Sequence, residues 1–197
     1  MQQLVNIILA SASPRRRDLM QQLGLKFSVE VFPVDEKNFE PDPIDKVNSI
    51  VEQKMNEAVK QLPKHSLEKS CVVCADTIVV INDTVLGKAN NKDEAKEMLK
   101  KLSGQKHTVM TAFSLYNLNR EMYSEVVVTQ VEFMTMTDSI IDQYLCYDEY
   151  KDKAGAYAIQ GLAGSYVKEV QGSYSNVIGL PQVQVLMALE KLKVIEL

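Results

Sequence analysis

Apolar positions recur along this chain with two different periods, and the periods separate strands from helices. The continuous apolar run at 5–10 predicts a strand buried on both faces. Alternating or continuous apolar segments predict further strands at 27–34, 71–80, 85–86, 107–118, 121–134 and 165–170. Apolar residues three and four apart predict helices at 15–23, 44–61, 92–102, 137–146 and 182–191. This order predicts an α/β fold, a mixed sheet flanked by helices.

Boundary residues sharpen several of these predictions. Ser13 precedes Pro14, which predicts a helix N-cap followed by proline at the first helical position. Gly24 is the expected helix stop, and Asn82-Asp83 predicts a hairpin turn. We expect loops at 35–43 and 172–181, where prolines, glycines and polar residues gather.

Composition limits the classes of protein that the chain can belong to. Its 197 residues are 46% apolar, enough for a buried core, and favour a single domain over 1–197. The 22 basic and 26 acidic residues leave a net charge of −4, which argues against nucleic acid as a partner. No apolar run reaches the roughly 20 residues of a membrane span, so we expect a cytoplasmic protein without membrane contact. Cys71 and Cys74 indicate core or strand thiols, and the three cysteines, with Cys146, make no disulfide framework, which favours a reducing compartment.

The first candidate site is Ser11-Ala12-Ser13-Pro14-Arg15-Arg16-Arg17, directly after the first apolar strand. Backbone N–H groups at a helix N-terminus carry positive partial charge, and arginine offers a planar fork that matches phosphate oxygens. Successive helical residues point about 100° apart, so at most two of the arginines face one ligand. The segment predicts either an anion site or a solvated helix face.

A second candidate is the pair Asp76 and Thr77, within the apolar strand at 71–80. A carboxylate is costly to bury unless it is paired or hydrogen-bonded. The pair therefore predicts either a functional site or a break that lets Asp76 reach solvent. We expect the strand to be interrupted at Ala75-Asp76-Thr77.

Weaker signals come from glycines and from isolated charged residues. The glycine-rich segments at 152–161 and 172–181 allow close approach of backbone to a ligand, or simply form turns. Lys54 and Lys88 are surface lysines unless a site lies near them. His65 and His107 have no partner at metal-ligand spacing, which indicates solvated or core histidines.

Together these segments resemble the Maf family of nucleoside triphosphate pyrophosphatases, from about residue 7 to about residue 190. Five ordered motifs carry the resemblance: Leu9-Ala10-Ser11-Ala12-Ser13-Pro14-Arg15-Arg16, Ala75-Asp76-Thr77, Leu102-Ser103-Gly104-Gln105, Asp152-Lys153-Ala154-Gly155-Ala156-Tyr157 with Ile159-Gln160-Gly161, and Asn176-Val177-Ile178-Gly179-Leu180-Pro181. Because the motifs occur in order, the set is far more specific than any one of them.

The resemblance implies a fold related to the inosine-triphosphate pyrophosphatases, a mixed twisted sheet with two lobes and a central cleft. It implies hydrolysis of a nucleoside triphosphate to the monophosphate and pyrophosphate with a divalent cation, Mg²⁺ or Mn²⁺. The segment Ile159-Gln160-Gly161 is similar to the branch that prefers dTTP and UTP and removes modified pyrimidine nucleotides. Homodimers are common in this family.

The resemblance also implies roles for single residues. Asp76 matches the general base, and Glu36 and Asp76 match carboxylates near the metal. The substrate-binding positions are Ser11, Arg15, Arg16, Lys54, Thr77, Lys88 and Gln160. Of these, Arg15, Thr77 and Gln160 match specificity positions, whereas Arg17 is expected on the helix surface.

Two other functions fit the same residues. One is a pyrophosphatase for purine or modified-purine triphosphates. The other is a non-enzymatic, nucleotide-binding regulator of cell division. Turnover of different nucleotides, measured as released pyrophosphate, separates all three.

Overall fold

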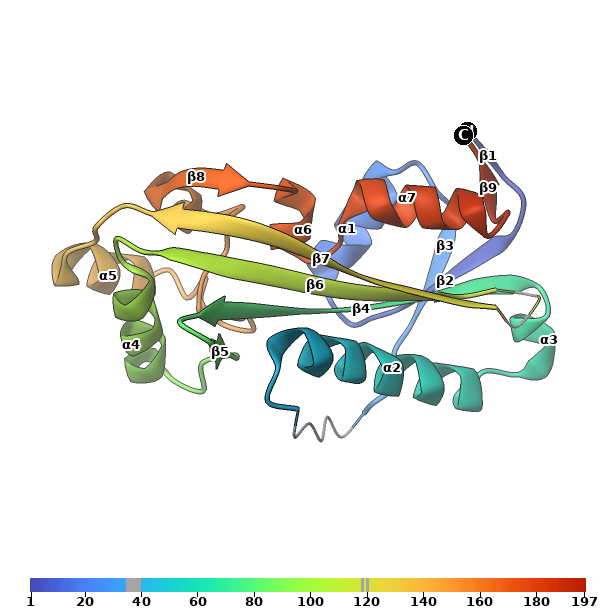
Figure 1. Ribbon diagram of the computed structural model, residues 1–197, viewed down its shortest axis with the longest axis horizontal. Helices are drawn as coiled ribbons and strands as arrows, with labels where there is room; N and C mark the ends of the chain where they lie inside the picture. The colour runs from blue at the N-terminus through green and yellow to red at the C-terminus, as the bar shows by residue number, and fades with distance from the viewer. Residues whose placement is uncertain (35–39, 118, 120) are drawn as a thin grey trace. The chain divides into compact units, whose positions relative to one another are not determined.

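Helices and strands occupy largely the segments that the apolar periods predict (Figure 1). The computed structural model describes residues 1–34, 40–117, 119 and 121–197. Its strands are β1 (Gln2–Gln3), β2 (Asn6–Ala10), β3 (Phe27–Glu30), β4 (Ser70–Ile81), β5 (Thr84–Leu86), β6 (Lys106–Tyr116), β7 (Met122–Phe133), β8 (Val167–Gln171) and β9 (Ile195–Glu196). Its helices are α1 (Pro14–Gln22), α2 (Pro43–Gln61), α3 (Lys64–Leu67), α4 (Lys92–Leu102), α5 (Asp138–Leu145), α6 (Tyr174–Ile178), α7 (Gln182–Lys191) and the 3₁₀ helix η1 (Leu162–Tyr166).

The larger sheet is mixed, which confirms the predicted α/β class. Its strand order is β3-β2-β4-β6-β7-β8, and β5 pairs with β4 off this path. β2 runs parallel to β3 and β4, whereas the β4–β5 and β7–β8 pairs are antiparallel. β1 and β9 form a separate antiparallel pair. Those two strands are too short to show an apolar period, so the sequence pattern does not predict them.

The chain divides into two compact units, each built from several segments. Unit 1 comprises Met1–Asp76, Thr111–Val127 and Gly179–Leu197, and unit 2 comprises Thr77–Met110 and Val128–Ile178. The long strands β4, β6 and β7 contribute residues to both units. The single domain expected for 1–197 stays a prediction.

The core of unit 1 forms around β2 and the start of β4. Ile7, Ile8 and Leu9 are at most 4% exposed, as expected for an apolar strand covered on both faces. α2 lies on one side of these strands, and α1 and α7 lie on the other (Figure 1). The apolar stripe of α2, spaced three and four residues apart, is buried: Val47, Ile50, Val51, Met55 and Ala58.

β4 is continuous from Ser70 to Ile81, so the predicted interruption at Ala75-Asp76-Thr77 is wrong. The Asp76 carboxylate lies 2.5 Å from Lys54 Nζ. Because a cation from another element compensates the charge, the strand can hold a carboxylate without breaking. The turn that follows β4 is the predicted hairpin, with positive φ at both Asn82 and Asp83.

The expected loop at 172–181 contains a short helix, α6. Ser173 Oγ accepts the N–H of Asn176 at 3.2 Å, and Asn176 Nδ2 donates to Thr129 Oγ1 and to Val109 O. Asn176, a polar residue of this expected loop, is thus buried against β6 and β7. The predicted strand at 165–170 likewise begins later, at Val167, because η1 occupies the residues before it.

Cys71 and Cys74 are buried, as predicted for core thiols. Burial raises the pKa of each thiol to about 12. Both side chains are therefore neutral thiols at physiological pH, which suits packing and not metal binding or nucleophilic chemistry.

A buried aromatic cluster in unit 2 surrounds His107, which is 2% exposed. Its ring meets those of Phe133 and Tyr157 edge to face, at centroid distances of 5.2 and 5.4 Å. The Tyr157 hydroxyl lies 2.9 Å from Nε2, and Nδ1 has no hydrogen-bond partner among the described residues. Burial lowers the pKa of His107 to about 4, which confirms a neutral core histidine.

The lowered pKa of His107 predicts that the folded protein loses stability in acid. The unfolded chain protonates His107 near pH 6.5, whereas the folded protein takes up that proton only near pH 4. Stability from the neutral histidine is complete above pH 6.5 and is lost as the pH falls towards 4, by about 3 kcal/mol in all. Urea unfolding from pH 7 to pH 4.5 measures the change.

The substitution His107→Gln keeps an amide near the Tyr157 hydroxyl but removes the titrating group. Between pH 6.5 and 4.5 we expect the free energy of unfolding of this variant to fall much less than that of the wild type. His65→Gln, on the exposed helix α3, is the matched control and retains the fall. Equal pH slopes in wild type and His107→Gln contradict the assignment.

Candidate active site

The turn between β2 and α1 is ordered by its own serines. Ser13 Oγ accepts the N–H of Arg16 at 3.5 Å and caps α1, while Pro14 takes the first helical position, as predicted. Ser11 Oγ accepts the N–H of Ser13 at 3.2 Å. These local bonds fix the direction in which α1 leaves the strand.

Strand pairing brings this turn close to the polar pair on β4. β2 and β4 run parallel with Leu9 opposite Val73. β2 ends at Ala10, whereas β4 continues, so the next residues of β4 lie beside the turn that begins at Ser11. In α/β proteins ligands bind at the carboxyl ends of parallel strands, where the chain turns into a helix.

Two cations from different helices meet the carboxylate of Asp76. Lys54 Nζ, from α2, is 2.5 Å from Oδ1, and Arg16 Nη2, from α1, is 4.0 Å from the same atom. The three side chains are between 12% and 21% exposed, so the cluster is mostly buried but reaches solvent. Attraction between such charges is much stronger than in water.

Arg16 also connects parts of unit 1 that lie far apart in the sequence. Its Nε donates to the carbonyl of Gly179 at 2.9 Å, and its Nη1 donates to Ser11 Oγ at 3.4 Å. A single planar guanidinium thus holds the segment before α7, the turn after β2 and the carboxylate on β4. A lysine at this position could not make these bonds in three directions at once.

The cluster is locally positive within an acidic chain. Arg16 and Lys54 against the single carboxylate of Asp76 leave a formal charge of +1. Arg15 lies half-buried on the first turn of α1, whereas Arg17 is 54% exposed beside Asp18, as expected for helix surface. Such a cluster at a helix N-terminus is suited to a phosphate-bearing anion.

The other predicted substrate residues, Thr77, Lys88 and Gln160, belong to unit 2. Lys88 forms an antiparallel bridge with Ala154, and the carbonyl of Gly87 accepts the N–H of Gly155 at 3.0 Å. The segment with Lys88 therefore lies along the glycine-rich segment that leads to Gln160. Both Lys88 and Gln160 are exposed.

Gly155 fixes this segment against β4. Its φ is +68°, and an added Cβ would lie 3.1 Å from the methyl groups of Val79, two residues beyond Thr77. Glycine satisfies both the left-handed backbone and the close packing. In unit 2 the structure therefore brings together β4, the Lys88 segment and the glycine-rich segment.

The described residues fit a metal ion that is held by one protein carboxylate together with substrate phosphates and water. Glu36, a predicted metal residue, lies outside the described residues, and among those described no three His, Cys, Asp or Glu side chains gather at one point. Asp76 is the carboxylate of the cluster. Mg²⁺ is commonly held by one or two carboxylates together with substrate phosphates and water, and this donor set fits that arrangement.

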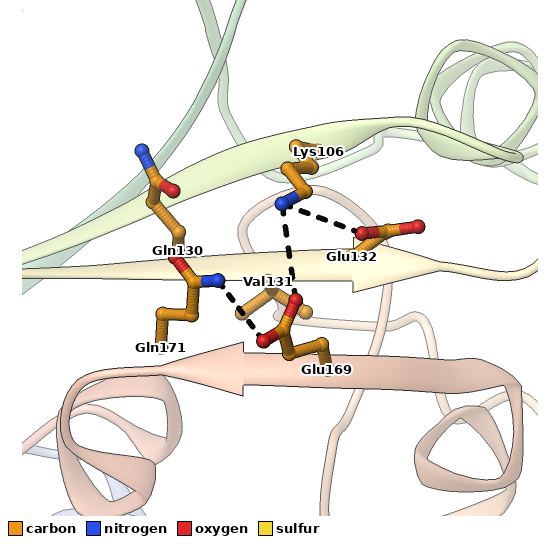
Figure 2. A pocket seen from close by; sticks show the side chains of 6 residues that line it. All are labelled: Lys106, Gln130, Val131, Glu132, Glu169 and Gln171. Atoms are coloured by element: carbon orange, nitrogen blue, oxygen red, sulfur yellow. Dashed lines mark hydrogen bonds and ion pairs between the residues drawn. The ribbon is translucent and has the colours of Figure 1, made fainter.

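A second polar cluster lies on β6, β7 and β8 and has a different character (Figure 2). Lys106 pairs with Glu132 at 3.6 Å and with Glu169 at 3.8 Å, and Lys168 pairs with Glu132 at 2.5 Å. The hollow between these side chains does not admit a water molecule. Exposed ion pairs of this kind contribute little to stability, so we describe this cluster as a polar surface of the sheet.

Sequence reasoning missed two groups that shape these segments. One is the carbonyl of Gly179, which no side-chain pattern reveals although it stands in a matched motif. The other is Glu149, whose Oε2 accepts the N–H of Leu162 at 2.9 Å. Charged residues surround Glu149 in the sequence, so it looks like part of a solvated run.

In the described part of the chain, no helix combines the length and apolar character required to cross a bilayer.

Comparison of the sequence with known proteins identifies related proteins over most of the chain. A family model described as "Maf-like protein" matches residues 6–192. The dTTP/UTP pyrophosphatase of Colwellia psychrerythraea is 42% identical over 89% of this chain and 82% of that protein. The dTTP/UTP pyrophosphatase of Pyrococcus abyssi is 39% identical over 94% of this chain and 95% of that protein.

The fold itself extends to more distant proteins. The Ham1 protein of Staphylococcus aureus is 14% identical and aligns with a TM-score of 0.54, over 94% of this chain and 98% of that chain. At this identity the likeness concerns the fold alone.

The contacts of Arg16 predict that it stabilises the fold, unlike its neighbour. Arg16→Ala removes two hydrogen bonds and one of two cations beside Asp76, at a cost of about 2 kcal/mol in the free energy of unfolding. Arg17→Ala, the matched control, changes it by less than about 0.5 kcal/mol. Urea unfolding measures both, and equal effects contradict the structural role of Arg16.

Proposed function

Because this chain belongs to the family of Maf-like proteins, we propose that it is a nucleoside triphosphate pyrophosphatase that hydrolyses dTTP and UTP. The products are the nucleoside monophosphate and pyrophosphate. The observation that carries the proposal is the carboxylate of Asp76, placed between Lys54 and Arg16 beside the turn that opens α1. A base and cations in one place are what attack of water on a phosphate requires.

In the proposed reaction, a water oxygen attacks the α-phosphorus. The bond from that phosphorus to the oxygen that bridges the α- and β-phosphates breaks, and pyrophosphate leaves with the electron pair. Asp76 orients the water and accepts its proton, which then passes to solvent. The strand that carries Asp76 is buried in the sheet, so the position of this base is fixed before substrate arrives.

When the substrate binds, Lys54 and Arg16 exchange contacts with the Asp76 carboxylate for contacts with phosphate oxygens. In the structure they compensate the charge of Asp76, and a bound triphosphate offers them further anionic oxygens. Arg15, Lys88 and the hydroxyl of Ser11 add donors to the phosphates. Because charge accumulates on the phosphate oxygens during the reaction, these preplaced donors stabilise the transition state.

We propose that Asp76, together with Glu36, holds a divalent cation, Mg²⁺ or Mn²⁺, that binds with the triphosphate. When bound, such an ion neutralises phosphate charge and makes the phosphorus more open to attack.

Selection of the base is assigned to Gln160 and Thr77. A glutamine amide offers both a donor and an acceptor, as the edge of thymine or uracil requires. Gln160 is exposed at the end of the glycine-rich segment, where its amide is accessible to a ligand. The names of the relatives, dTTP/UTP pyrophosphatase, support this choice over a purine substrate.

The proposed setting is the reducing cytoplasm, which suits the free thiols of Cys71, Cys74 and Cys146. There the enzyme would remove modified pyrimidine nucleotides before they are incorporated. The homodimer expected from the family stays a prediction.

The substrate assignment predicts a specific nucleotide profile. With Mg²⁺ or Mn²⁺, pyrophosphate release from dTTP and UTP exceeds release from GTP and ITP by at least about tenfold in kcat/KM. Chelation of the metal by EDTA abolishes release, and added Mg²⁺ restores it. Equal turnover of GTP or ITP contradicts the pyrimidine preference, and faster turnover of GTP or ITP identifies a purine enzyme. Nucleotide binding without release of pyrophosphate identifies a regulator.

The assignment of Asp76 predicts that its substitution impairs catalysis far more than it impairs folding. Asp76→Asn lowers kcat for dTTP by about 10²–10³-fold, because the amide cannot accept the proton. Asp83→Asn, the same substitution in the exposed hairpin turn, keeps wild-type turnover. Circular dichroism checks that the Asp76→Asn variant is folded. If the folded variant releases pyrophosphate at nearly the wild-type rate, Asp76 is not the base.

A further inference from the structure

The turn that carries Gln160 is held by a carboxylate from another part of unit 2. Glu149 lies in the turns that follow α5, and its Oε2 accepts the N–H of Leu162 at 2.9 Å. Leu162 begins η1, and the first N–H groups of a helix have no partner within it. Glu149 thus caps η1 two residues after Gln160.

The same carboxylate lies directly against the backbone of Gly161. A Cβ at this glycine would overlap Oε2 of Glu149 and would lie 2.6 Å from its Cδ. The φ of Gly161 is −104°, which residues with side chains also adopt, so the backbone conformation does not require glycine. A Cβ at this position would displace the Glu149 carboxylate, so the glycine leaves room for that group beside the backbone.

A second anchor holds the other side of the turn. The N–H of Ala158 donates to the Tyr144 hydroxyl at 3.2 Å, and the N–H of Gly161 donates to the carbonyl of Ala158 at 3.0 Å. Tyr144 is 1% exposed and belongs to the core. Gln160, exposed, therefore lies between a hydroxyl anchor before it and a carboxylate anchor after it.

We propose that Glu149 is a positioning residue that sets base selectivity by fixing the backbone at Gly161 and Leu162, directly after Gln160. This inference rests on the proposed function, in which the Gln160 amide selects the base. A hydrogen-bonding side chain discriminates between bases only when it is placed to a fraction of an ångström, and a displacement of about 1 Å can cost about 100-fold. Glu149 acts on the turn and not on Asp76, so its loss alters binding of the base more than the chemical step.

The experiment measures the ratio of kcat/KM for dTTP to that for GTP. Both values come from one preparation, so the folded fraction cancels. Glu149→Ala lowers the ratio by about tenfold or more, mainly through a higher KM for dTTP, with kcat within about threefold of wild type. Glu149→Gln, which retains an acceptor for the Leu162 N–H, restores most of the ratio.

Asp148→Asn is the matched control for charge. Asp148 is the adjacent carboxylate, exposed and paired with Lys151 at 2.7 Å, and this variant keeps the wild-type ratio. Gln160→Ala is the reference for loss of the selecting amide itself and lowers the ratio at least as far as Glu149→Ala.

A double substitution tests the mechanism. Gly161→Ala pushes the carboxylate away, so it lowers the ratio by itself but adds nothing to Glu149→Ala. Gly164→Ala is the contrasting case, because its Cβ would overlap the backbone carbonyl oxygen of Ile159. We expect Gly164→Ala to lower the dTTP-to-GTP ratio by the same factor in the Glu149→Ala variant as in the wild type.

The outcomes separate the two proposals. If Glu149→Ala keeps the ratio within about twofold while Gln160→Ala loses it, Glu149 does not position the turn and the inference is overturned, although the proposed function stands. If wild type does not discriminate between dTTP and GTP, the proposed substrate is wrong, and the inference falls with it. The inference is established if Glu149→Ala lowers the dTTP-to-GTP ratio, Glu149→Gln restores it, and Gly161→Ala causes no further loss in the Glu149→Ala variant.

Discussion

The contact between Lys54 and Asp76 is the constraint on which the rest of unit 1 depends. A carboxylate in the interior of a strand is unfavourable unless a cation reaches it, and here the cation comes from α2 at a distance of 2.5 Å. The pairing keeps β4 continuous and fixes one face of α2 towards the strand. It also leaves a charged cluster with partial access to solvent, where an anionic ligand can compete for the cations.

Arg16 extends this constraint across the sequence. Its bonds to Ser11 and Gly179 join the two ends of unit 1 around the same carboxylate. One guanidinium therefore has both a structural role and a place at the proposed phosphate site. Such residues make stability and activity depend on each other, because a substitution that alters one alters the other.

Local signals account for the parts of the fold that the sequence predicted well. The bounds of α4 and α7, the cap at Ser13 and the hairpin at Asn82-Asp83 agree with prediction, because each depends on residues within one or two turns of chain. The sequence also pointed to Asp76, since a charged residue in an apolar strand is conspicuous. It could not show that β4 runs through Asp76 unbroken, because the compensating lysine lies 22 residues away.

The sequence by itself determined the class of fold, most of the longer helices and strands, and the family, through apolar periods and ordered motifs. Only the tertiary structure decided which charged residues meet. Lys54 looks like a surface lysine until α2 packs beside β4, and Glu149 looks like part of a solvated run until its carboxylate caps η1 beside Gln160. The physical reason is the same in both cases. A charge has a role only through its partner, and partners far apart in sequence are brought together by packing that no local pattern encodes.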